Sequence, residues 1–374
     1  MSLRAIARVN LAAIERNVAR LRRALSGAEM CAVVKADGYG HGAVPAARAS
    51  LAGGAGWLAV ATADEAAELR SAGIAARILV MGALSREELS VALAAEADLV
   101  AWNEQFVSEL KREAGAGREA RVHIKLDSGM GRLGTRELGE ALATARRVLE
   151  AAPALKLAGA MTHFATADED LGFVSEQLER FAPFVDELRA LQPGLVAHAA
   201  NSAATIREPA SHFDMVRCGI AIYGCDPMNV DPDQHALEPA LELRSYVAAA
   251  KPIRVGESVG YGRRFVAARE TVVATLPIGY ADGIRRALTN NCDVLVGGAR
   301  YPLVGTVSMD NITIDVGPQP SVRPGDDATI IGRDQAVRQT AEDVAHRLGT
   351  INYEVLCGIS GRVPRVYHRD GEPA

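Results

Sequence analysis

The sequence predicts an α/β protein, with an N-terminal (β/α)8 TIM-type barrel followed by a C-terminal, mostly β domain. The chain has 374 residues, which is long for one ordinary domain. Its first part alternates eight short apolar runs with stretches of helical periodicity, whereas its last part contains mainly strand-like runs punctuated by glycine, proline and aspartate. Eight strand–helix repeats favour a closed barrel over an open doubly wound sheet.

The predicted barrel strands are short, apolar and bounded by turn residues. They cover residues 31–36, 57–61, 77–81, 98–102, 121–126, 157–163, 196–201 and 214–217. The clearest predicted helices between them, with apolar residues at helical spacing, cover 64–72, 85–97, 137–151 and 175–191.

The second domain is predicted to be mostly β. Its strands are predicted at 241–249, 271–276, 293–296, 303–307, 312–316 and 328–331, with one helix at 341–348. A segment rich in proline and aspartate, 228–234, marks the boundary. The barrel is therefore predicted to cover 10–234, and the β domain 1–9 plus 235–374.

Composition restricts the class of protein. The formal net charge of −5 predicts neither a nucleic-acid nor a membrane partner. No apolar run is long enough to cross a bilayer, and residues 1–10 lack the hydrophobic region of a signal peptide. The five cysteines are scattered without a C-x-x-C pair, which predicts no disulfide framework, no metal site and a reducing cytoplasm.

The segment V-V-K-A-D-G-Y-G-H-G places Lys35 where the first barrel strand ends. Burial disfavours an ammonium, so such a lysine can become a neutral amine near neutral pH. A neutral amine can form a Schiff base with a carbonyl, most often that of pyridoxal phosphate. A lysine that merely reaches from a strand end to solvent is the alternative, and the glycine-flanked Tyr39 and His41 argue against it.

Other polar residues also follow predicted strands, at the end of a barrel where catalysis takes place. His163 closes the sixth strand, Asn201-Ser202 the seventh, and Arg217-Cys-Gly219-Ile220 the eighth. The loops after the last two strands recurrently bind phosphate in this fold. Gly219 would allow the backbone to approach a phosphate closely. The Ile220 amide and the Ser202 hydroxyl could each donate a hydrogen bond to it. A helix N-cap uses the same geometry, so both roles of Ser202 remain open.

Two further cationic residues lie near the fifth strand. Arg132 ends a glycine-spaced segment, D-S-G-M-G-R, and its rigid fork suits a carboxylate or a phenolic oxygen. A tight turn with a solvated arginine is the alternative. Lys125 lies within the strand, where a buried ammonium needs a negative partner or a modification.

Three segments of the second domain also draw attention. Tyr261 lies between two glycines, which predicts exposure in a tight loop. Tyr280 occurs in P-I-G-Y-A-D-G, and Met309-Asp310 follow a strand in V-S-M-D. Each tyrosine taken alone could be a packing residue.

Together these segments resemble the alanine racemase family of pyridoxal-phosphate enzymes, of fold type III. The match runs in the same order from V-V-K-A-D-G-Y-G-H-G to N-Y-E at 352–354. The resemblance implies a barrel followed by a β domain, in a head-to-tail homodimer with shared active sites.

The resemblance also implies the two catalytic bases. Lys35 would bind the cofactor covalently and act as one base, and Tyr261 of the other subunit would act as the second. Arg217 would face the pyridine nitrogen, with His163 joining it to Tyr261. The remaining implied contacts of the cofactor are Tyr39, Asn201, Ser202, Gly219, Ile220 and Tyr353, most of them at its phosphate.

Substrate contacts are implied as well. Arg132 would touch the phenolic oxygen of the cofactor and the substrate carboxylate. Met309, with Asp310 beside it, would receive that carboxylate on its backbone amide, and Tyr280 would narrow the entry. Lys125 matches a lysine that is often carbamylated in the family.

The implied activity is interconversion of L-alanine and D-alanine, which supplies D-alanine for peptidoglycan. A broader amino-acid racemase is one alternative. A fold-type-III decarboxylase is another, although that class has an acidic residue where Arg217 would lie. A third alternative is a carrier protein that binds the cofactor without catalysis, but such a carrier has a single domain and would lack the β domain.

Overall fold

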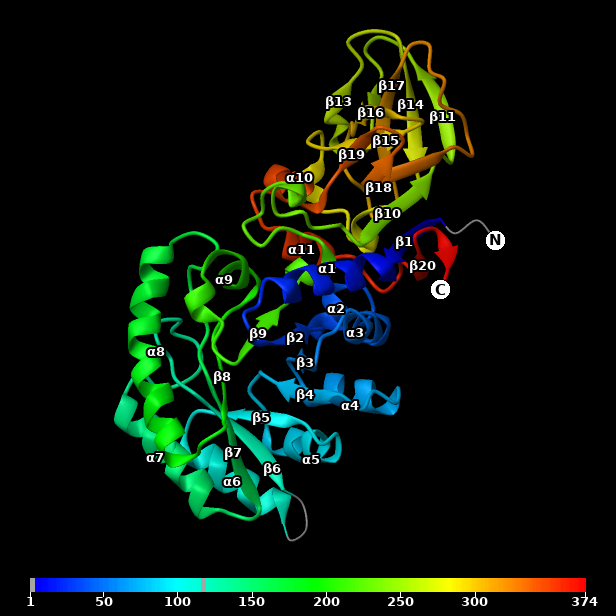
Figure 1. Cartoon of the computed structure of the whole chain (residues 1–374). Coiled ribbons are helices and arrows are strands. Elements are labelled where there is room, and N and C mark those ends of the chain that lie inside the picture. Colours follow the sequence, from blue (N-terminus) through cyan, green and yellow to red (C-terminus); the bar gives the residue numbers. More distant parts are fainter. Residues whose placement is uncertain (1–3, 116–118) are drawn as a thin grey trace. The chain divides into compact units, whose positions relative to one another are not determined.

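The computed structural model describes residues 4–115 and 119–374. Residues 1–3, assigned above to the β domain, lie outside this part. The chain forms two compact units, Ile14–Ile222 and the combination of Met1–Ala13 with Tyr223–Ala374 (Figure 1). The domain limits predicted from the sequence, 10–234 and 1–9 plus 235–374, remain a prediction.

The unit Ile14–Ile222 is built on eight parallel strands in the order β8-β7-β6-β5-β4-β3-β2-β9. Backbone hydrogen bonds from Asp214 to Ala197 (3.0 Å) and from Arg217 to Ala200 (2.9 Å) join its two ends. All eight predicted strands are confirmed. They are β2 Glu29–Val33, β3 Trp57–Val60, β4 Arg77–Val80, β5 Asp98–Ala101, β6 Ala120–Lys125, β7 Leu155–Met161, β8 Val196–His198 and β9 Met215–Cys218.

Helices lie outside these strands (Figure 1). Several of these helices begin directly after an N-cap residue whose side chain accepts a hydrogen bond from the first turn. Thr62 and Ser85 form capping boxes with Glu65 and Glu88, and Asn103 accepts from the Phe106 amide at 2.8 Å. The helices are α1 Leu11–Arg23, α2 Lys35–Tyr39, α3 Ala43–Ala52, α4 Ala63–Ser71, α5 Arg86–Ala94, α6 Glu104–Ala114, α7 Leu138–Glu150, α8 Leu171–Leu191 and α9 Ser202–Arg207, with short 3-10 turns at Pro209–Ser211 and Ile220–Tyr223.

The apolar core of this unit lies between the strands and the helices. Leu69, Leu89 and Leu110 on helices are fully buried, as are Leu58 and Leu79 on strands. Burial of this kind contributes roughly 2 kcal/mol for each large side chain. None of the helices described here has the length and apolar character needed to cross a membrane.

The second unit is mostly β. One sheet has the order β16-β15-β18-β10-β1-β20-β21, with β19 beside β18; a second has the order β11-β14-β17, and β12 pairs with β13. The elements are β1 Ala5–Asn10, β10 Leu241–Tyr246, β11 Ala249–Ile253, β12 Ser258–Val259, β13 Phe265–Val266, β14 Thr271–Leu276, β15 Asp293–Val296, β16 Ala299–Pro302, β17 Ile312–Gly317, β18 Asp327–Asp334, β19 Val337–Gln339, β20 Arg365–Arg369, β21 Glu372–Pro373, α10 Ala341–Leu348 and α11 Asn352–Cys357, with 3-10 turns at Pro232–His235, Tyr261–Arg263, Tyr280–Asp282 and Arg286–Leu288. Both parts of the predicted fold class are confirmed.

Two predicted strands are wrong in detail. Residues 303–307 form no strand, because Gly305 adopts a φ of 78° and the ladder is reduced to one bridge at Leu303. The strand lies earlier, at β16, which pairs with β15 across the Gly297-Gly298 turn. The run 241–249 is divided, since β10 ends at Tyr246 and β11 belongs to another sheet.

Candidate active site

The loop that carries Lys35 is a left-handed turn. β2 ends at Val33, and Lys35 follows half-buried at the start of α2. The next four residues have positive φ: Ala36 52°, Asp37 52°, Gly38 61° and Tyr39 53°. Each non-glycine residue in this region costs roughly 1–2 kcal/mol, and such strain is concentrated at functional sites.

Hydrogen bonds from neighbouring elements hold this turn. The Ala36 amide donates to Glu65 Oε1 at 2.6 Å, and the Ala43 amide donates to Asp37 Oδ1 at 2.8 Å. The Lys35 backbone is therefore fixed from α4 and from the start of α3.

Tyr39, Gly219 and Ser202 form a small cradle. A Cβ atom placed on Gly219 would lie 2.4 Å from the Tyr39 hydroxyl, so any larger residue there would have to displace the tyrosine. The Gly219 amide donates to Ser202 Oγ at 2.9 Å, and the Ala221 amide approaches the same oxygen at 3.4 Å. Two hydroxyls and a bare backbone thus meet beyond the carboxyl ends of β2, β8 and β9.

The structure excludes one of the two roles considered for Ser202. The N-cap of α9 is Asn201, whose Oδ1 accepts from the Ala204 amide at 3.0 Å. Ser202 is therefore not the cap. Its oxygen accepts from the loop after β9, which leaves its hydroxyl hydrogen to donate elsewhere.

Arg217 is a buried cation at this end of the barrel, with 2% of its surface exposed. Its guanidinium donates to the Thr162 carbonyl (2.9 Å), the Ala199 carbonyl (3.0 Å), His198 Nδ1 (2.8 Å) and His163 Nδ1 (3.1 Å). Burial lowers the pKa of Arg217 to about 10, so it stays charged at neutral pH.

His163 is neutral in this environment. Burial, together with the positive charges of Arg217 and Lys125, holds the pKa of His163 well below its usual value. Because Nδ1 accepts from Arg217, the ring proton lies on Nε2, which can donate to a further group.

Lys125 ends β6 and is buried, as predicted, with 3% of its surface exposed. Burial, followed by the charges of Arg217 and Arg132, lowers its pKa to about 8. The described residues supply no ion-pair partner for Lys125. An amine that is half neutral at pH 8 is a reactive nucleophile.

Arg132 lies exposed at the end of a loop that Asp127 organises. Asp127 Oδ1 accepts from the amides of Gly131 (2.9 Å) and Gly129 (3.1 Å), and Arg136 reaches its Oδ2 at 3.1 Å. Burial alone would raise the pKa of Asp127, but these hydrogen bonds hold it below its usual value.

In the β unit, Tyr261 is 74% exposed, which confirms the predicted exposure in a tight loop. Gly260 and Gly262, on either side, adopt φ of 75° and 69°. Thr306 Oγ1 donates to the Tyr261 carbonyl at 2.6 Å. The backbone is therefore held while the phenol side chain points away from the unit's own core.

Tyr280 and Met309 belong to two loops joined by backbone hydrogen bonds. The Tyr280 amide donates to the Ser308 carbonyl at 2.9 Å, and the Ala281 amide donates to the Met309 carbonyl at 3.1 Å. A Cβ atom on Gly279 would lie 2.3 Å from the Ser308 carbonyl oxygen, so this contact requires glycine.

Asp310 has a structural partner, because Arg362 Nη2 donates to its carboxylate at 2.8 Å. Tyr353 lies half-buried in α11. The preceding Asn352 is fully buried and donates to the Asp226 carbonyl at 2.7 Å and to Glu342 Oε1 at 2.8 Å. In the N-Y-E segment the asparagine therefore anchors the backbone beside Tyr353.

Family models match the chain in two consecutive parts. The alanine racemase N-terminal domain matches residues 9–227, and the alanine racemase C-terminal domain matches residues 240–367. The chain belongs to the alanine racemase family.

Individual members of the family match it over almost the whole length. The alanine racemase of Thermobifida fusca is 44% identical over 373 residues, which cover 98% of this chain and 99% of the relative. That of Symbiobacterium thermophilum is 41% identical over 370 residues and covers 96% of each. The predicted family and the prediction of an isomerase are confirmed.

Solved structures of the family have the same fold. The alanine racemase from Bacillus anthracis, determined with bound L-Ala-P, has a TM-score of 0.93 at 39% identity and covers 100% of this chain and 97% of its own. The alanine racemase from Streptomyces coelicolor has a TM-score of 0.92 at 38% identity and covers 97% of each chain.

Two positioning residues were missed in the sequence. Gln177 on α8 is fully buried, and its amide donates to Ser128 Oγ and to the His163 carbonyl, both at 3.1 Å. The sequence feature that could have revealed Gln177 is its position one helical turn before Phe181, on an otherwise apolar face of α8. Asp282, the aspartate of P-I-G-Y-A-D-G, is also fully buried; it pairs with Arg4 and accepts from the Gly279 amide at 2.9 Å.

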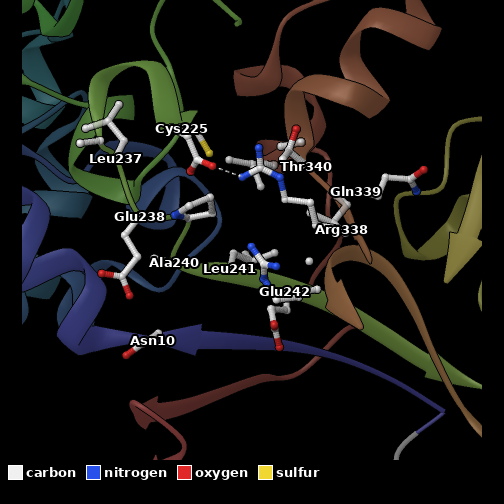
Figure 2. Close-up of a pocket in the computed structure, with 18 of the residues that line it drawn as sticks. Asn10, Cys225, Leu237, Glu238, Ala240, Leu241, Glu242, Arg338, Gln339 and Thr340 are labelled. Atoms are coloured by element: carbon white, nitrogen blue, oxygen red, sulfur yellow. Dashed lines mark hydrogen bonds and ion pairs between the residues drawn. The ribbon is translucent and has the colours of Figure 1, made fainter. Parts of the chain in front are cut away.

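The β unit also contains a cavity of about 620 Å³, shown in Figure 2. Arg338, one of its lining residues, donates to Asp233 at 2.9 Å. Leu237, Leu241 and Cys225 also line it. No residue that lines it was predicted for the active site.

Proposed function

We propose that this protein is a pyridoxal-phosphate-dependent alanine racemase that interconverts L-alanine and D-alanine and supplies D-alanine for peptidoglycan. The cluster of Tyr39, Gly219 and Ser202 next to Arg217 carries the proposal. It is supported by the names of the relatives, which match over nearly the full chain.

The residues of this cluster fit the cofactor. A Cβ atom on Gly219 would lie 2.4 Å from the Tyr39 hydroxyl, so glycine allows this hydroxyl to lie against the loop after β9, where it could donate to a phosphate. Tyr39 and Ser202 supply hydroxyls, and Ile220 would supply an amide, with Asn201 fixing the start of α9 behind them. Hydroxyl and amide donors are the groups that bind a phosphate.

When bound, pyridoxal phosphate supplies an electron-withdrawing ring that acidifies the α-proton of an attached amino acid. Arg217 would face this ring as a cation, because a pKa of about 10 keeps its protons in place at neutral pH. Arg132 would bind the substrate carboxylate with its fork, and the Met309 amide would add a second contact.

Racemisation requires a proton to leave one face of the α-carbon and to return on the other. Bases on opposite faces achieve this. In our proposal these are the Lys35 amine and the Tyr261 hydroxyl of a second subunit. His163 would donate its Nε2 proton toward that tyrosine, since its Nδ1 is occupied by Arg217.

A homodimer with shared active sites is part of the proposal. Tyr261 is 74% exposed, and Met309 is 52% exposed, although both side chains are large and largely apolar. Exposed residues of this kind are enriched at protein interfaces. Tyr280 would narrow the entry to the site, and Tyr353 would contact the phosphate of the cofactor.

We also propose that Lys125 carries a carbamate. Its neutral amine attacks the carbon of CO2 and loses a proton to water, so an N-carboxylate replaces a buried cation. This change would place a negative charge near Arg132 and Arg217, the two arginines whose charges help to lower the Lys125 pKa. It would remove the cost of burying an unpaired ammonium.

Reduction with borohydride tests the attachment of the cofactor. Purified protein treated with borohydride and digested should yield one modified peptide, with the label on Lys35. A chiral assay with several L-amino acids should show D-alanine as the main product. A label on another lysine, or release of CO2 in place of a D-amino acid, would reject the proposal.

A further inference from the structure

A string of buried polar side chains runs through the barrel from β5 to β9. Asp98 begins β5, His123 lies in β6, His198 ends β8 and Arg217 lies in β9. Asp98, His123 and His198 are fully buried, and Arg217 is 2% exposed. Groups buried this deeply must satisfy one another.

Consecutive members of the string are within hydrogen-bond distance. Arg217 Nη1 lies 2.8 Å from His198 Nδ1, and His198 Nε2 lies 2.8 Å from His123 Nδ1. His123 Nε2 lies 3.1 Å from Asp98 Oδ2. The string therefore links the buried cation near Lys35 to a carboxylate at the amino-terminal end of the strands.

Only one arrangement of protons satisfies every contact. A guanidinium can only donate, so His198 Nδ1 must accept and the His198 proton lies on Nε2. That proton is donated to His123 Nδ1, so the His123 proton lies on Nε2 and is donated to Asp98. A proton added to either ring would set two N–H groups against each other.

The shifts of the pKa values agree with two neutral histidines and an ionised Asp98. Burial and the neighbouring cations hold the pKa of His198 well below its usual value, and burial also lowers the pKa of His123. Burial alone would raise the pKa of Asp98, but the hydrogen bonds and charges of His123 and Arg121 lower it. Arg121 Nε lies 2.6 Å from Asp98 Oδ1, and Arg77 pairs with Oδ2.

The backbone of β7 is adapted to this string. His123 in β6 reaches His198 in β8 across the intervening strand, where Gly159 pairs with His123. A Cβ atom on Gly159 would lie 2.0 Å from His123 Nδ1. Gly159 has no positive φ that would require glycine. The His123 ring and the Val196 carbonyl oxygen, which lies 2.6 Å from the same Cβ position, leave no room there for a side chain. Trp57 packs edge-on against that ring, with centroids 5.9 Å apart.

We propose that His123 and Asp98 are positioning residues for Arg217, because they hold the His198 Nε2–H on an acceptor and so fix the ring whose Nδ1 receives the guanidinium. The four acceptors of Arg217 named above are neutral, and the carboxylate at the far end of the string is already paired with Arg121 and Arg77. The guanidinium thus keeps its charge and presents a fixed edge beside His163. The effect on catalysis rests on the proposed function, whereas the proton arrangement does not.

Nitrogen NMR of 15N-histidine-labelled protein tests the string, with and without pyridoxal phosphate. The chain has eight histidines, which single substitutions assign. In the parent protein, His123 and His198 should both be neutral with the proton on Nε2 at pH 7. A proton on Nδ1 of either ring, or an imidazolium, would overturn the proposal.

Two variants separate positioning from packing. His123→Phe keeps a ring against Trp57 but removes the acceptor of His198, and it should shift and broaden the His198 nitrogen signals because the ring is no longer held at Nε2. Activity should fall about tenfold in kcat with KM for alanine changed less than about threefold. His123→Asn retains an acceptor near Nδ1 and should restore the His198 signal and most of kcat. His346→Asn, on the exposed face of α10, is the control.

An unchanged His198 signal and kcat in His123→Phe would overturn the proposal even if the parent tautomers are as expected. Should either variant fail to fold by circular dichroism, the tautomers of the parent protein still decide. A protein with the expected tautomers but no racemisation of alanine would reject the proposed function alone.

Discussion

Replacing Gly219 with alanine tests the cradle that is proposed to hold the cofactor phosphate. Gly219 does not have a positive φ, so alanine is compatible with its backbone. The obstacle is Tyr39, whose hydroxyl would lie 2.4 Å and whose Cζ would lie 2.9 Å from the new methyl carbon. An ordinary contact begins near 3.4 Å, so the tyrosine must retreat by about 1 Å.

The size of the expected effect depends on the packing and the hydrogen bond that are lost when Tyr39 moves. Overpacking of a buried position typically costs about 1–3 kcal/mol of stability. A hydroxyl that no longer reaches a charged phosphate loses about 1.5–3 kcal/mol, which corresponds to roughly 10- to 150-fold weaker cofactor binding. Because the methyl group and the hydroxyl compete for one place, Gly219→Ala and Tyr39→Phe should be less than additive.

Titration of the cofactor-free variant with pyridoxal phosphate, followed by absorbance, measures this loss. Gly139→Ala is the matched control, since a Cβ atom at Gly139 has no neighbour within 4 Å. If Gly219→Ala binds the cofactor as tightly as the parent, the cradle does not hold the phosphate.

Two pH-dependent predictions follow from buried groups. The Lys125 pKa of about 8 predicts that, at fixed free CO2, the 13C signal of its carbamate grows between about pH 7 and 9 and is absent in Lys125→Arg. The depressed pKa of His198 keeps it neutral in the folded protein, while the unfolded chain takes up a proton near pH 6.5. Stability present above pH 6.5 is therefore lost as the pH falls, by up to about 1.4 kcal/mol per unit. The free energy of unfolding of His198→Asn, measured with urea, should therefore depend less on pH below 6.5. The same pH dependence in the variant and the parent would contradict the assignment.

The periodicity of the sequence predicted the barrel well because each strand is a short apolar run between turn residues. The positions of Lys35, Ser202 and Arg217 at strand ends followed from the same pattern. The role of Ser202 could not be predicted, because it depends on which of two adjacent residues caps α9. The structure assigns that cap to Asn201.

The string from Asp98 to Arg217 was not predicted, since it joins residues that are far apart in the chain. Its only local signal is polar residues within apolar strands, as with His123 in R-V-H-I-K. In the β unit, the failure at 303–307 has a similar origin. Gly305 takes a positive φ against the Val259 carbonyl, a contact that apolar patterning does not reveal.

A hybrid dimer tests most directly whether Lys35 and Tyr261 of different subunits form one active site. Lys35→Ala and Tyr261→Phe chains with different affinity tags would be co-expressed, and the mixed dimer would be isolated by both tags. One of its two sites then has both native groups, so it should show about half of the parental alanine racemase activity, while each variant alone is nearly inactive. A mixed dimer as inactive as its two parents would contradict the account.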